Sequence, residues 1–395
     1  MKTPVYLHKP GVVCALGTTT DAVSRALFAS EPRPLTTTDA YTPGRELPLG
    51  VVDGDLPPLE GRDASRNNRL LLQALSQIQS LLDRQLDGLE PHRVGVVLGT
   101  STSGIGDAEQ AFREEACEQL PDWYDYAMQE IGAPAQFLAR HLGLSGPATT
   151  ISTACSSSGK ALASARRLLQ TGVCDLVICG GVDTLCRLTV NGFGALDSVS
   201  ERTCNPMSAN RDGINIGEAA SLFLMSREPA PVVLSGVGES SDAHHISAPH
   251  PEGLGALAAM RAALDDAGLP GEEIGYVNLH GTATPQNDSM ESRAVEQLLG
   301  LATPCSATKP LTGHTLGAAG ALEAAFCWLT LTGDGRLPRH WWDGQPDPAL
   351  PLLSLVNDDT RLASAPRHVL SNSFAFGGNN VALVLSGVDG VASDE

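Results

Sequence analysis

Cys155 is the residue whose type and position most directly suggest chemistry. It lies in ATTISTACSSSGKALASARRLL, where a β-type run of Thr, Ile and Ser changes abruptly into a helical pattern. The thiol is therefore expected at a helix N-terminus, where unpaired amides and the helix dipole favour the thiolate. A thiolate attacks carbonyl carbon atoms, so the position predicts a nucleophile, against the ordinary alternative of a buried, inert cysteine.

Two histidines occupy comparable positions. His280, in NLHGTATPQND, ends an expected strand and enters a turn, and His314 precedes the small-residue helix of GHTLGAAGALEAA. An imidazole at either place can project into a cleft and move a proton, and the other histidines lack such settings. Each alone is compatible with a hydrogen-bonded structural role. Together with Cys155 they predict one nucleophile that faces two imidazoles.

The elements that must position these residues recur along the chain. The run VGVVLGTSTSG, ending at Gly104, resembles GYVNLHGTATPQ, ending at Gln286, and each is a strand that breaks into a turn. A small-residue helix follows in each half, and then a strand that closes on two glycines, in DLVICGGVD and in HVLSNSFAFGGNN. If the halves are related by pseudo-symmetry, Cys155 and His314 begin equivalent helices and His280 ends an equivalent strand.

The alternation of strands and helices predicts an α/β fold made of two halves. The REPAP stretch, Arg227 to Pro231, carries two prolines before a fresh strand, VVLSGVGES. We therefore expect an N-terminal half at residues 1–229, which carries the nucleophile, and a C-terminal half at residues 230–395, which carries both histidines.

The composition limits the class of protein and its partners. The chain has 395 residues, 42% hydrophobic and 18% charged, as expected for a well-buried globular protein. Its formal charge of -19 argues against nucleic acid or an anionic membrane as the main partner, since both bind clustered Lys and Arg. Nine cysteines without CxxC pairs or zinc spacings favour a reduced, cytoplasmic setting without a metal. No apolar run approaches the roughly 20 residues of a membrane span.

Four runs, STACSSS, LHGTATPQND, SATKPLTGHTLGAAG and NSFAFGGNN, resemble in this order the motifs of elongating β-ketoacyl-[acyl-carrier-protein] synthases, members of the thiolase superfamily. The similarity covers nearly the whole chain. Within the family, SSDAHHISAPHP with LHGTATPQND is most similar to the ketosynthases of aryl polyene biosynthesis clusters. The resemblance implies a thiolase-like duplicated fold, layered α-β-α-β-α with two pseudo-symmetric halves, and no organic cofactor or metal.

The resemblance assigns the Cys-His-His set of elongating members to Cys155, His280 and His314. Initiating members have Asn where His314 stands, and non-decarboxylating thiolases have a second cysteine in the last Gly-rich loop, which SNSFAFGGNN lacks. The implied reaction moves an acyl group to Cys155 and condenses it with malonyl-ACP, with loss of carbon dioxide. The amides of Cys155 and Phe376 would hold the oxyanion, and the two imidazoles would hold the enolate.

Further residues match motif positions of the same family. Lys309 matches its active-site lysine and Glu323 its carboxylate, with a solvated surface ion pair as the alternative for both. Thr282 and Thr284 match contacts of the carrier's pantetheine arm, with turn formation as the alternative.

Phe374 and Phe376 flank Ala375 ahead of the last two glycines. The resemblance places both at the substrate and makes Phe376 a gate that moves as acyl chains enter. Either ring is otherwise explained as plain core.

The carrier protein of this family is strongly acidic, so a chain of charge -19 needs a local positive surface to bind it. The helix RNNRLLLQALSQIQSLL buries its regularly spaced apolar residues and leaves Arg66 and Arg69 at an exposed start, where they are expected to dock the carrier. The implied partners are acyl- and malonyl-loaded carrier protein and a second subunit. That subunit is either an identical chain or a homologue of the chain-length-factor type.

Alternatives stay open at this point. A non-catalytic, chain-length-factor-like subunit would share the fold, although such subunits usually lack the nucleophile that Cys155 provides. A thiolase acting on coenzyme A thioesters is disfavoured by the missing second cysteine. For the substrate, straight-chain fatty acyl elongation is the alternative to aryl polyene chains.

Overall fold

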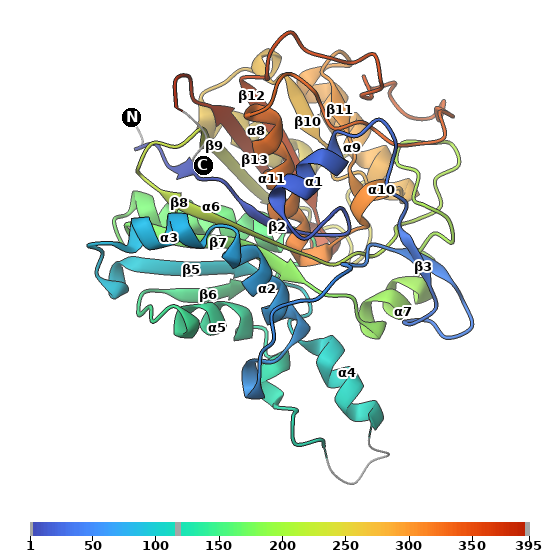
Figure 1. The fold of residues 1–395 in the computed structure, drawn as a ribbon. Coiled ribbons are helices and arrows are strands. Elements are labelled where there is room, and N and C mark those ends of the chain that lie inside the picture. Colours follow the sequence, from blue (N-terminus) through green and yellow to red (C-terminus); the bar gives the residue numbers. More distant parts are fainter. Residues whose placement is uncertain (1–2, 115–119, 392–395) are drawn as a thin grey trace.

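The computed structural model describes residues 3–114 and 120–391. Figure 1 shows two sheet-and-helix halves stacked on each other, the blue and green N-terminal half below and the orange and red C-terminal half above. Both chain ends lie on the same side of the molecule (Figure 1).

Each half contains five strands in the same order. The N-terminal half has the order β2-β8-β7-β5-β6, and the C-terminal half has the order β9-β13-β12-β10-β11. In both, three strands run parallel and two pair antiparallel, and β1 (Tyr6–Leu7) pairs with β8 and β9 and so links the halves. The strands are β2 (Gly11–Val13), β5 (Val94–Gly99), β6 (Ala148–Ile151), β7 (Leu176–Asp183), β8 (Ala219–Ser226), β9 (Val232–Ser241), β10 (Tyr276–Asn278), β11 (Cys305–Ser306), β12 (His368–Phe374) and β13 (Asn379–Gly387).

The helices complete a layered α-β-α-β-α arrangement, so the predicted duplicated α/β fold is confirmed. Two central helices lie between the halves, and two helices cover the outer face of each half, where separate apolar clusters form. The central pair is α6 (Ser157–Gln170) and α11 (Ala319–Leu331), and the outer helices are α2 (Arg66–Ser76), α5 (Ala133–His141), α8 (Leu254–Ala267) and α9 (Pro285–Leu299). The boundary expected between residues 229 and 230 falls in the connection from β8 to β9 and stays a prediction.

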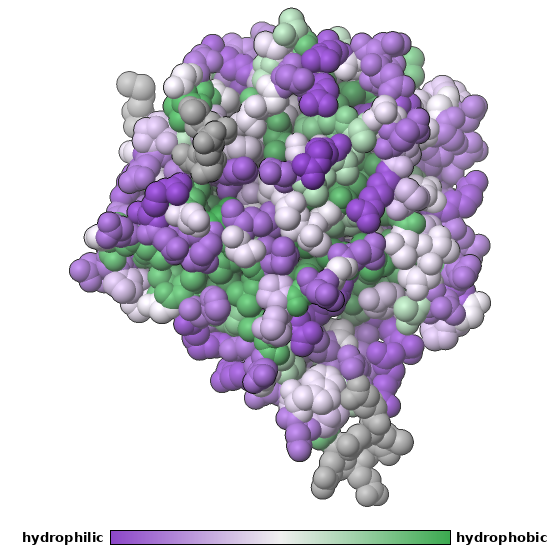
Figure 2. All heavy atoms as spheres, in the orientation of Figure 1, coloured by the Kyte–Doolittle hydropathy of each residue, from purple (hydrophilic) through white to green (hydrophobic). Residues whose placement is uncertain are grey.

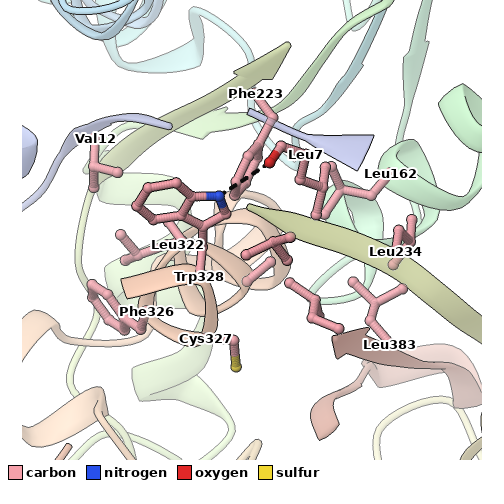
Figure 3. Packing of buried hydrophobic residues seen from close by; sticks show 14 of the residues in the cluster. Leu7, Val12, Leu162, Phe223, Leu234, Leu322, Phe326, Cys327, Trp328 and Leu383 are labelled. Carbon is pink, nitrogen blue, oxygen red and sulfur yellow. Dashed lines mark hydrogen bonds between the residues drawn. The ribbon is translucent and has the colours of Figure 1, made fainter. Parts of the chain in front are cut away.

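Helix α11 is buried along its whole length because it contacts strands of both halves. Its sequence, AGALEAAFCWLTL, accordingly has no polar face. Figure 3 shows Trp328 of α11 packed against Phe223 and donating its indole N–H to the carbonyl of Leu7, at 3.1 Å. Small residues let α6 approach closely: a Cβ on Gly320 would lie 2.7 Å from the amide nitrogen of Gly159.

The remaining elements lie around this body. A small hairpin is formed by β3 (Thr36–Thr38) and β4 (Leu47–Leu49), and further helices are α1 (Thr20–Leu27), α4 (Ile105–Glu114), α7 (Arg187–Ala195) and α10 (Lys309–Thr312). The run predicted as a single helix from Arg66 is two helices, because the chain breaks after α2 and resumes as α3 (Gln79–Leu86). At the break, the side chain of Gln77 bonds to Val12 and Thr20.

Hydrophilic residues cover most of the face seen in Figure 2, and a band of hydrophobic residues crosses its lower half, over β5 and the neighbouring helices. Within residues 3–114 and 120–391, no helix combines the length and apolar character needed to cross a bilayer.

Candidate active site

Cys155 lies on a tight turn between β6 and α6. The residue before it, Ala154, has a φ of 52°, a left-handed conformation that is uncommon for a residue with a Cβ. This turn places the thiol just ahead of α6, where Cys155 is 4% exposed. The second half repeats the geometry, because Gly313 has a φ of 67° immediately before His314 and α11 follows.

The structure brings the three predicted groups together. His314 Nε2 lies 2.9 Å from Cys155 Sγ, and the rings of His280 and His314 meet edge to face with centroids 5.2 Å apart. The sulfur and one nitrogen of each ring all lie within 4.8 Å of one another. Zinc accepts this donor set, but the ammonium of Lys309, 3.5 Å from His280 Nδ1, opposes a divalent cation there.

Burial determines whether the Cys155 thiol and the two imidazoles are charged. It raises the pKa of Cys155 to about 12, although Lys309 and the backbone N–H groups of Phe376 and Cys155 act in the opposite direction. Burial and the charge of Lys309 hold the pKa values of both histidines well below their usual range. Backbone N–H groups thus act on the thiol in the direction expected from the sequence, but in the resting site the desolvation of the sulfur outweighs them.

Lys309 and Glu323 form a buried pair rather than a surface one. Lys309 Nζ lies 2.5 Å from Glu323 Oε1 and 2.5 Å from the carbonyl oxygen of His280, and both side chains are almost fully buried. Burial raises the pKa of Glu323, and the neighbouring Lys309 partly offsets this. The pair ties α11, which follows His314, to the backbone of the other histidine.

A cleft leads from the surface to Cys155. Thr282 and Thr284 line it, with their hydroxyl oxygens 3.0 Å apart, and Thr284 also caps α9 by accepting the Asn287 amide. Both threonines thus take part in a turn and face the cleft.

Two phenylalanine residues also line this cleft. Phe374 meets His280 edge to face, with centroids 6.1 Å apart, and Phe376 packs on Phe193 of α7 at 5.4 Å. Phe376 also directs its backbone N–H at the Cys155 sulfur. The structure therefore brings the predicted substrate residues to the same place as the nucleophile.

Arg66 and Arg69 are half-buried, which differs from the exposed start expected for them. The Arg66 guanidinium donates to both oxygens of Glu218, which is fully buried, and to the carbonyl of Val52. Sequence reasoning placed the helix start correctly but missed this acid, which lies 152 positions further along the chain. The charge of Arg66 is therefore neutralised inside the fold.

Two buried acids at the site were missed. Asp183 ends β7 and accepts hydrogen bonds from the loop after β5 and from Gly317, three residues after His314. Glu291 of α9 accepts the amides of His280 and Gly281, each at 2.7 Å, and burial raises its pKa to about 7. Asp183 closes the DLVICGGVD strand, so its position at a strand end was the available signal.

Sequence models of the β-ketoacyl synthase N-terminal and C-terminal domains match residues 54–230 and 232–340. A 3-oxoacyl-[acyl-carrier-protein] synthase 2 from Staphylococcus aureus is 33% identical, over 82% of this chain and 86% of its own length. Its counterpart from Vibrio cholerae is 31% identical, over 97% of this chain and 99% of its own.

A solved structure is more similar still. A chain in the complex of the ketosynthase ApeO with its chain length factor ApeC from Xenorhabdus doucetiae is 46% identical, with a TM-score of 0.93, covering 98% of both chains. These matches confirm the resemblance that the four motifs indicated. This chain belongs to the β-ketoacyl synthase family of acyltransferases and has its thiolase-like fold.

Proposed function

We propose that the chain is a decarboxylating β-ketoacyl-[acyl-carrier-protein] synthase in which Cys155 carries the acyl group. The observation that carries the proposal is the 2.9 Å approach of His314 Nε2 to Cys155 Sγ, with His280 beside them at the buried end of an open cleft. A nucleophile with two adjacent imidazoles suits acyl transfer followed by carbanion chemistry.

In the first step, the Cys155 sulfur attacks the carbonyl carbon of an acyl thioester. Its proton passes to His314 and then to the departing carrier thiolate, so that an acyl-cysteine and a free carrier thiol result. The backbone N–H groups of Cys155 and Phe376, already directed at the sulfur, stabilise the oxyanion that forms.

In the second step, a malonyl thioester enters along Thr282 and Thr284. Its bond to the carboxylate breaks, carbon dioxide leaves, and the electron pair forms an enolate. The enolate accepts N–H bonds from His280 and from His314, whose proton moves from Nδ1 to Nε2 between the two steps. The enolate carbon attacks the acyl-Cys155 carbonyl, the carbon–sulfur bond breaks, and a proton from solvent restores the thiol. Both imidazoles act in their neutral form, because burial and the charge of Lys309 disfavour their protonation.

Similarity to relatives supports a substrate class and a partner for this chain. The 46% identity to a chain of the ApeO–ApeC complex supports aryl polyene chains as the acyl groups and a chain-length-factor-like homologue as the second subunit. Homodimers and straight fatty acyl chains are the other outcomes. Arg69 contributes to carrier docking in this proposal, although Asp107 lies near enough to interact with its charge; Arg66 is held by Glu218.

The test uses radiolabelled acyl-carrier and the Cys155→Ala variant, which we expect to take up no label. His314→Ala should lose malonyl decarboxylation more strongly than acylation. Mass spectrometry of carrier-bound products, with cinnamoyl-type and saturated primers in parallel, identifies the substrate. Label on Cys155→Ala would refute the assignment. If the unchanged chain takes up no label, and condensation occurs only after a homologous subunit is added, the result would favour a non-catalytic role.

A further inference from the structure

Two of the segments that line the cleft lie partly at the surface, and we take the mouth of the cleft to lie between them. On one side Leu196 and Ser198 follow α7, and on the other the stretch Ser247 to Pro249 belongs to the loop after β9. Each segment carries a large apolar side chain at the surface, since Leu196 is 55% exposed and Ile246 is 80% exposed. If the proposed function is correct, the body of a carrier protein lies over this mouth whenever its arm reaches Cys155.

Helix α7 presents a regular row of residues beside the mouth. Leu188, Gly192 and Leu196 are spaced by four positions and therefore share one face of the helix. Leu188 is 58% exposed, and a Cβ on Gly192 would meet no atom within 4 Å. This α7 ridge, Leu188, Gly192 and Leu196, thus has a gap the size of one side chain at its centre.

The fold does not require a glycine at position 192. The residue lies inside α7 without a positive φ, and no neighbouring atom would clash with a Cβ there. Glycine inside a helix costs about 1 kcal/mol relative to alanine. An unforced glycine between two exposed leucines indicates that a group from outside the chain approaches the helix at this point.

Two of the arginines near the ridge are paired with acids. Arg45, whose guanidinium lies 3.9 Å from the Cβ position of Gly194, pairs with Glu201 at 3.0 Å, and Arg202 pairs with Asp212 at 2.9 Å. Arg187, which begins α7, has no ion pair among the described residues, so one positive charge stands beside an otherwise apolar ridge.

We infer that an acyl carrier protein docks on the α7 ridge and Ile246, and that one apolar side chain of a carrier helix fills the gap over Gly192. Helices pack by seating the side chains of one in the grooves of the other, and the gap between two leucines is such a groove. The inference rests on the proposed function, because the arm that enters the cleft identifies the occupant.

Gly192→Leu fills the gap and tests the inference. With acyl and malonyl groups on a carrier protein that the unchanged chain uses, we expect KM for the carrier to rise about tenfold. With the same groups on free pantetheine, the rate should stay within about twofold, since no carrier body is involved. Ile246→Ser keeps its backbone carbonyl, which accepts the Gly377 amide, and should raise the carrier KM about fivefold.

The matched control is Leu301→Ser. Leu301 is 44% exposed and follows α9, about 16 Å along the helix from Met290, the last residue of α9 that lines the cleft. This variant should leave both reactions unchanged.

A carrier KM that is the same in Gly192→Leu and Ile246→Ser as in the unchanged chain overturns the inference. So does a change in the mass of Gly192→Leu in solution, because the ridge would then be a contact between subunits. An equal loss with pantetheine-bound groups also overturns it, because the residues would then act on the cleft itself. Failure of the unchanged chain with both substrates refutes the proposed function instead.

Discussion

Cys155 and His314 face each other across 2.9 Å as a neutral thiol and a neutral imidazole. Because burial disfavours both charged forms, an ion pair between them is not the resting state. The thiolate forms as its proton moves to the imidazole and the sulfur attacks the substrate. Lys309 is the nearest lasting positive charge, so the buried pair that it forms with Glu323 is part of the electrostatics of the site.

Removing one partner of the Lys309–Glu323 pair should lower the free energy of unfolding more than removing both partners. Glu323→Gln leaves the Lys309 charge buried without its acid, and we expect a loss of about 3–5 kcal/mol in the free energy of unfolding. Lys309→Met with Glu323→Leu should stay within about 1–2 kcal/mol of the unchanged chain and yet lose condensation. Urea unfolding measures both variants. A double variant as unstable as Glu323→Gln would contradict the reasoning.

His340 should make stability depend on pH. It is buried, accepts the Ala307 amide and donates to the carbonyl of Pro206, and burial lowers its pKa to about 4 from 6.5. Between these values the unfolded chain binds a proton that the folded chain does not, so stability falls as pH falls from 6.5 to 4, by up to about 3 kcal/mol.

His340→Gln keeps an acceptor and a donor at this position but cannot titrate. Urea unfolding at pH 4.5, 5.5 and 6.5 should show a smaller decline with acid in this variant than in the unchanged chain. Parallel declines would mean that other groups cause the acid sensitivity.

At the scale of elements, the crossing of α6 and α11 sets the distance between the catalytic groups. Cys155 stands ahead of one helix and His314 ahead of the other, and Gly159 and Gly320 let the two helices touch. The strand order repeated in both halves brings these helices to the centre, where each is covered by strands.

Gly320→Val should separate the helices. Its Cβ would lie 2.7 Å from the Gly159 nitrogen, so we expect a loss of about 3 kcal/mol or more in the free energy of unfolding. Acylation of Cys155 should fall with it, because the thiol and His314 move apart. Gly192→Ala is the matched control, since it adds a Cβ in open space and should stabilise α7 by up to about 1 kcal/mol.

At the scale of the whole molecule, the charge of -19 acts on stability as well as on binding. Like charges repel each other more in the compact folded state than in the unfolded chain. Salt shortens the distance over which this repulsion acts from about 30 Å at 0.01 M to about 10 Å at 0.1 M. We expect Tm to rise by a few degrees over this range. Calorimetry near pH 4.8, where the net charge is close to zero, is the control and should show little change.

Much of the fold and the site followed from local patterns. The position of Cys155 between a β-type run and a helix, and of His280 at a strand end, depends only on neighbouring residues, and both are as predicted. The single helix expected from Arg66 was wrong, because the backbone departs from helical geometry at Ile78. Beside this break the Gln77 side chain bonds to Val12 and Thr20, contacts that the local spacing does not contain.

The sequence by itself determined the kinds of residue at the site and the elements on which they stand, since motif and periodicity are properties of short segments. Only the tertiary structure decided their charge states and partners. His314 meets Cys155 across 159 positions, and Arg66 meets Glu218 across 152. Burial, which keeps the thiol and both imidazoles neutral, arises from two halves closing on one another, and no single segment carries that information.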